Sequence, residues 1–71
     1  MKSGTAGHWL VVYVTYSHQA AETVQQLLQA EGILVRCRAL NREISGSGTF
    51  ELCVLASEAQ EARKILLEKG L

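Results

Sequence analysis

The sequence predicts an α+β domain in which the elements follow one another as strand, helix, strand, strand, helix. Three short runs rich in β-branched and aromatic residues predict the strands. Two longer segments with apolar residues every three or four positions predict the helices. Glycine and serine stand at the boundaries between these segments, where turns and helix caps need them.

Composition limits what the protein can be. The chain has 71 residues, of which 48% are apolar, and this suits one small domain with a hydrophobic core. Seven Lys and Arg residues balance seven Glu residues, so no net charge favours nucleic acid or an anionic membrane surface. Asp is absent, which removes a common nucleophile and metal ligand.

The N-terminal region carries no pattern typical of export or membrane insertion. Residues 1–7, MKSGTAG, are small and polar, and we expect a flexible lead-in there before a single domain over residues 8–71. The apolar run over residues 9–14 is too short to cross a bilayer. The sequence therefore predicts a cytoplasmic protein that does not enter membranes.

The first strand and the first helix have clear local signals. Residues 9–15, WLVVYVT, predict the strand, and Ser17 can cap the helix that follows. Gly32 should end that helix, because it places Leu28 and Ile33 at the two positions that touch in a Schellman ending. The apolar stripe of the helix consists of Ala20, Ala21, Val24, Leu27 and Leu28.

The second and third strands flank a loop rich in glycine and serine. Residues 33–40, ILVRCRAL, and residues 49–55, TFELCVL, alternate as strands do, and residues 41–48, NREISGSG, predict a flexible hairpin loop. Ser57 and Gln60 have the spacing of a capping box at the start of the second helix. The core-facing residues expected in this helix are Ala59, Ala62, Ile65 and Leu66, with Gly70 at its end.

This order of elements predicts a ferredoxin-like, split βαβ arrangement. The helical crossover between the first two strands leaves room for the third strand between them, so three antiparallel strands take the order 1-3-2. Both helices then pack on one face of the sheet. The strand residues expected to face these helices are Leu10, Val12, Val14, Val35, Cys37, Phe50, Leu52 and Val54.

The first strand is expected at the border of the sheet, with one edge unpaired. A full ferredoxin-like domain continues into a fourth strand beside the first, whereas this sequence ends at Leu71. We expect no bulge in the strand, and it contains no Lys or Pro, so it lacks the features that protect edges from association. Trp9, Val11 and Tyr13 should lie on the helix-free face, where a second copy or another protein would cover them.

A Val- and Tyr-rich first strand, a helix with Leu27, Leu28, Glu31 and Gly32, and the segment ELCVLASEAQEA occur together in this chain. With these features the chain resembles a family of small bacterial proteins proposed to act in signal transduction. The resemblance implies a ferredoxin-like half-fold and a regulatory role, without catalytic residues or a cofactor. Some short proteins of this kind are called glutamate decarboxylases, but 71 residues cannot supply the fold that pyridoxal phosphate requires.

The two cysteines are expected on opposite faces of the sheet. Cys37 should be buried as a small apolar residue. Cys53 should lie on the helix-free face beside Arg36, whose charge would lower the pKa of the thiol. An alternative function follows, in which Cys53, Arg36 and the loop 41–48 sense a small molecule or a metal ion.

No residue pattern predicts an active site or a metal centre. His8 and His18 stand at opposite ends of the first strand, without Cys or carboxylate partners at ligand spacing. The cysteines do not form a C-x-x-C motif. Because no nucleophile, base and orienting group occur together, we expect no enzyme and no cofactor.

Arg36, Arg38 and Arg42 form the one basic cluster of the sequence. Beside the aromatic residues of the first strand it is similar to an RNA-binding sheet, but the aromatic-glycine signatures of that module are missing, so we do not expect nucleic-acid binding. Glu51 is expected to pair with one of these arginines across two strands, contributing ~0.2–1 kcal/mol.

The leading hypothesis is a small non-enzymatic regulatory or protein-interaction module. It would self-associate as a homodimer, or bind a protein partner, through the first strand or through the open face of the sheet. The sequence identifies no small-molecule effector. The residues expected to carry the interaction are Trp9, Val11, Tyr13, Arg36, Arg38 and Cys53.

Overall fold

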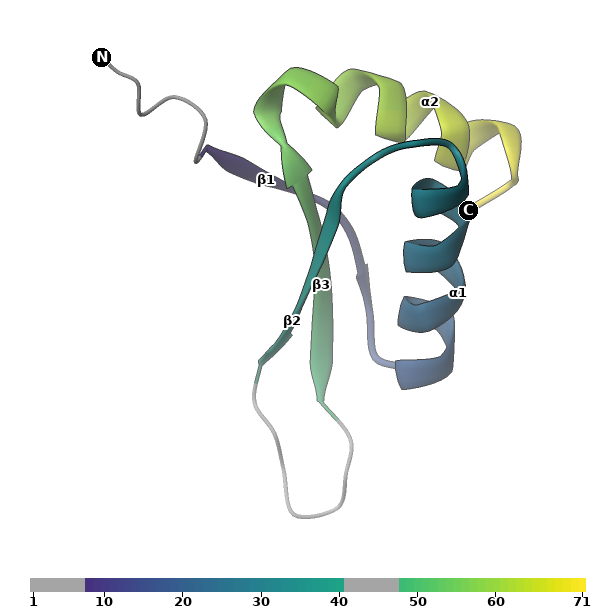
Figure 1. The fold of residues 1–71 in the computed structure, drawn as a ribbon. Coiled ribbons are helices and arrows are strands. Elements are labelled where there is room, and N and C mark those ends of the chain that lie inside the picture. Colours follow the sequence, from purple (N-terminus) through teal and green to yellow (C-terminus); the bar gives the residue numbers. More distant parts are fainter. Residues whose placement is uncertain (1–7, 41–47) are drawn as a thin grey trace.

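The computed structural model describes residues 8–40 and 48–71. The lead-in predicted for residues 1–7 and the loop predicted for residues 41–48, apart from Gly48, lie outside the described residues. All five predicted elements are present (Figure 1). They are β1 (Trp9–Thr15), α1 (His18–Ala30), β2 (Val35–Leu40), β3 (Thr49–Leu55) and α2 (Ala59–Glu68), with a 3₁₀ turn, η2 (Ala56–Glu58), before α2.

The three strands form one antiparallel sheet in the order β1-β3-β2, which confirms the predicted order and the α+β class. Leu52 and Val54, two positions apart on the central strand, share one core with buried side chains of both helices. Both helices therefore pack on the same face of the sheet. The largest side chains that are less than 2% exposed are Val24, Leu28, Leu52 and Val54.

The local signals at α1 are confirmed in detail. The Ser17 side chain accepts a hydrogen bond of 3.1 Å from a backbone amide in the first turn. Gly32 takes a φ of 87°, a conformation that only glycine adopts without cost. The Gly32 amide donates to the Gln29 carbonyl (2.9 Å) and the Ile33 amide donates to the Leu28 carbonyl (3.1 Å), which is the predicted Schellman ending.

The end of α2 agrees with the sequence, but its start does not. Gly70 takes a φ of 77°, and the amide after it donates to the Leu66 carbonyl (2.9 Å). The predicted capping box of Ser57 and Gln60 is wrong, because β3 runs directly into η2 and Ser57 becomes part of that turn. Glu58 then precedes the helix and makes no side-chain cap hydrogen bond.

β1 contains a β-bulge, and the expectation that it has none is wrong. Val11 pairs with Cys53 while Tyr13 pairs with Leu52, the adjacent residue of β3, so Val12 is one extra residue in β1. Side chains alternate along a strand. The extra residue therefore exchanges the faces of every position that follows it.

Tyr13 and Val14 lie on the opposite sides from those predicted. Tyr13, expected on the helix-free face, packs against the core beneath the helices together with Val12. Val14, expected inside, pairs with Glu51 and is 51% exposed. The bulge thus takes an aromatic residue away from the helix-free face and puts a valine there.

Candidate functional site

The helix-free side of the sheet, the open face, is formed by side chains from all three strands. The register places Trp9 opposite Leu55, and it places Val11 and Arg36 on either side of Cys53. In the described part of the chain, both helices lie on the other side of the sheet (Figure 1). The open face consists of Trp9, Val11, Val14, Arg36, Arg38, Leu40, Thr49, Glu51, Cys53 and Leu55.

Arg36 and Trp9 join the two edge strands above the central strand. The guanidinium carbon of Arg36 lies 5.0 Å from the centre of the Trp9 ring, which is a cation–π geometry. Two strands with one strand between them are about 9–10 Å apart, so both side chains must reach over β3 to meet. A contact of this kind at a partly exposed site contributes ~0.5–1 kcal/mol.

Cys53 lies on the open face beside Arg36, as predicted, but its side chain is only 2% exposed. β3 is the central strand, and the side chains of Val11 and Arg36 flank the thiol from both neighbouring strands. In this conformation the thiol is almost closed to a metal ion or a small molecule. The arrangement gives no support to a sensor built on Cys53.

Cys37 is exposed, and the prediction that it is buried is wrong. It pairs with Leu52 and therefore faces the helix side, but β2 is an edge strand that runs away from α1 (Figure 1). Val35 is the one residue of β2 that the helices bury. Partial loss of water around the thiol, together with nearby Cys53, raises the pKa of Cys37.

Arg38 stands directly opposite Glu51 in the pairing of β2 with β3. The register is the one that the predicted pairing of an arginine with Glu51 requires, and the ion pair itself stays a prediction. Opposite charges at directly opposed strand positions attract each other. A positive and a negative residue therefore stand opposite each other at one end of the open face.

Three large apolar side chains on or beside the open face are more than one third exposed. Val11 is 38% exposed, Val14 is 51% exposed and Leu34 is 59% exposed. Leu34 precedes Val35, which faces the helices, so alternation directs Leu34 toward the open face. Sequence reasoning missed Val14 as a surface residue, because residues 9–14 are all apolar or aromatic and no alternation marks their two faces.

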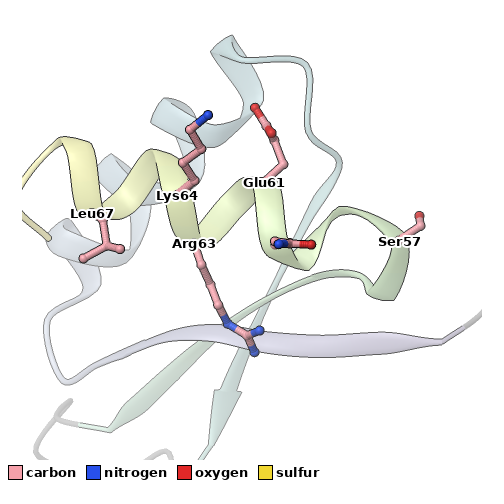
Figure 2. Close-up of a pocket in the computed structure, with 6 residues that line it drawn as sticks. Ser57, Glu61, Arg63, Lys64 and Leu67 are labelled. Atoms are coloured by element: carbon pink, nitrogen blue, oxygen red, sulfur yellow. The ribbon is translucent and has the colours of Figure 1, made fainter.

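A hollow of about 680 Å³ lies along the outer side of α2 (Figure 2). Glu61 and Lys64 point to one side of the helix, whereas Arg63 points to the other side, toward β1 (Figure 2). The charged side chains that line the hollow point in different directions, so they cannot contact one ligand together. The hollow is lined by Ser57, Gln60, Glu61, Arg63, Lys64 and Leu67.

His18 begins α1 and packs edge-on against Phe50, with 5.5 Å between ring centres. Among residues 8–40 and 48–71, no three His, Cys, Asp or Glu side chains are grouped to hold a metal ion. None of the helices in those two ranges is long and apolar enough to cross a membrane.

Comparison with known proteins finds no match to a family model, to a curated protein or to a solved structure. The side chains of the sheet and of the helices beside it therefore carry the evidence for function.

Proposed function

We propose that this chain is a non-enzymatic regulatory or protein-interaction module with a ferredoxin-like half-fold, and that two copies associate by stacking their open faces. The observation that carries the proposal is the Trp9–Arg36 contact beside the exposed side chains of Val11 and Val14. Trp and Arg are the residue types that most often dominate binding at the centre of an interface. Two sheets that stack in this way pack about 10 Å apart. The regulatory part of the proposal rests on the family resemblance.

The geometry favours the open face, rather than the free edge of β1, as the surface that binds a second copy. The bulge at Val12 interrupts the outer row of backbone donors and acceptors, and bulges are a common protection of edges. Arg63 also reaches from α2 toward β1. Two copies paired along β1 about a two-fold axis would bring two such charges toward each other.

The charges of the open face suit self-association. Seven positive and seven negative residues leave the chain without net charge, so two copies do not repel each other. Arg38 stands opposite Glu51, and Arg36 lies over Trp9. Stacking two open faces therefore need not bury a charge without a partner, which is the costly case.

Sedimentation equilibrium from micromolar to millimolar concentration tests this proposal. We expect a concentration-dependent dimer that Val14→Lys weakens, raising the Kd at least about tenfold, because a new charge would be buried at the interface. Leu67→Lys is the matched control. Leu67 is 76% exposed, but it lies on α2 beside the other face, so this variant should dimerise as the parent protein does.

Two results would contradict the proposal. One is a parent protein that sediments as a monomer over the whole concentration range. The other is a dimer that Leu67→Lys dissociates while Val14→Lys leaves it intact, since the copies would then meet on the helix side of the sheet.

A further inference from the structure

Two hollows adjoin on the helix side of β1, where that strand forms the border of the sheet. One has a volume of about 330 Å³ and lies between β1 and the first turns of α1. The other has a volume of about 290 Å³ and lies between β1 and α2. Both are lined by Tyr13 and Leu71, so they form one groove in two parts. The other lining residues are Ser17, Gln19, Ala20, Thr23 and Val24 in the first part, and Val12, Arg63, Leu66 and Leu67 in the second.

The groove lies beside backbone groups that can bind an extended chain. In the part of the chain that the structure describes, β1 pairs only with β3, and the bulge leaves Tyr13–Thr15 as a regular stretch of strand beyond it. A segment added along this stretch would make main-chain hydrogen bonds. Its alternate side chains, about 6.6–6.8 Å apart, would point toward the helix side, where the groove lies.

The lining of the groove specifies the chemistry of such a segment. Leu67 is 76% exposed and Leu71 is 48% exposed, so apolar side chains would be covered by an apolar partner. Arg63 is the one charged side chain among the residues that line either part. Figure 2 shows Arg63 pointing from α2 toward β1, whereas its neighbour Lys64 points to the opposite side of the helix. A guanidinium at this position favours a carboxylate in the bound segment.

We propose that this groove binds an extended segment of a partner protein, with apolar side chains at alternate positions and an acidic residue that faces Arg63. The segment would pair with β1 as an added strand. The groove lies on the helix side of the sheet, so this interaction is separate from the stacking of open faces. Either proposal can fail while the other holds.

A capped synthetic peptide with valine at alternate positions and one glutamate is the probe, and a matched peptide with lysine in place of the glutamate is its control. We expect the glutamate peptide to shift the backbone amide signals of Tyr13, Val14, Leu67 and Leu71 in the NMR spectrum of the full chain. Arg63→Glu should weaken binding of the glutamate peptide at least about tenfold and should make the lysine peptide the better ligand. Lys64→Glu, which changes the same charge on the other side of α2, should leave the preference of the parent protein unchanged.

Three results would overturn the proposal. The first is an absence of shifts with both peptides. The second is equal binding of the two peptides, because Arg63 would then select nothing. The third is a set of shifts confined to Trp9, Val11 and Arg36, because the peptide would then bind the open face. Self-association is measured separately by sedimentation, so none of these outcomes depends on it.

Discussion

Trp9 and Arg36 stand on opposite edge strands of the sheet and meet across β3, with 5.0 Å between the guanidinium carbon and the centre of the indole ring. This contact lies over the part of β3 where Cys53 is 2% exposed. A sheet face without a helix normally leaves its central residues open to water. Here two long side chains supply part of the cover that a helix supplies on the other face.

Removing the indole should therefore uncover the thiol of Cys53. In a Cys37→Ser background, which leaves one thiol, Trp9→Ala should speed the reaction of Cys53 with a disulfide reagent about two- to fivefold, because losing a contact of ~0.5–1 kcal/mol lowers the free energy of the local opening that exposes the thiol. Absorbance of the released thiolate measures the rate. Tyr16→Ala is the control, because Tyr16 is an aromatic residue 76% exposed, and it should not change the rate. Equal rates for Trp9→Ala and the parent would show that the indole does not protect the thiol.

The core between the sheet and the helices should dominate stability. Leu52 is 0% exposed, and Leu52→Ala should lower the free energy of unfolding by about 2–5 kcal/mol through lost apolar burial and the cavity that remains. Because a domain of this kind has roughly 5–15 kcal/mol in total, the urea midpoint should fall steeply. Leu67→Ala makes the same chemical change at a side chain 76% exposed and should stay within about 0.5 kcal/mol of the parent. Similar losses in both variants would argue against this placement of the core.

The two serines near the helix starts should differ in their effect on stability. Ser17→Ala removes an observed cap hydrogen bond and should lower the free energy of unfolding by about 0.5–2 kcal/mol. Ser57→Ala should stay within about 0.5 kcal/mol of the parent, because Ser57 lies inside η2, where no side-chain cap hydrogen bond forms. Chemical unfolding in urea measures both. A loss at Ser57 as large as that at Ser17 would show that a capping box forms after all.

Cys37 should make stability fall with rising pH in the alkaline range. Its pKa in the folded protein is raised, first by loss of water around the thiol and then by nearby Cys53, above the ordinary value of 9.0. As the pH rises through 9.0, the unfolded chain loses the proton first, so deprotonation favours unfolding. The difference in unfolding free energy between ~pH 8 and ~pH 10 should therefore be smaller in Cys37→Ser than in the parent. An identical pH dependence in the two proteins would contradict the raised pKa.

Local signals and chain connectivity were sufficient to predict both ends of α1, the end of α2 and the order of the strands. Ser17 caps α1, and Gly32 and Gly70 end the two helices in the left-handed conformation, because these effects depend on residues adjacent in the chain. The strand order followed from connectivity, since a helical crossover leaves a space that the next strand can occupy. A period of 3.6 residues marks one side of a helix, and most helix residues predicted to face the core are buried, whereas Ala20 and Leu27 are half-buried.

The exposure of several strand residues depends on packing that local sequence does not reveal. The extra residue at Val12 appears only when β1 pairs with β3. The apolar run around it carries no alternation that could specify a face. Tyr13 and Val14 therefore lie on the opposite faces from those predicted. The burial of the two cysteines is also the reverse of the prediction. Cys37 stands on an edge strand beyond the cover of α1, while Cys53 stands on the central strand beneath side chains from both neighbours. Exposure in a sheet depends on what lies above and beside a residue, and those neighbours come from distant parts of the chain.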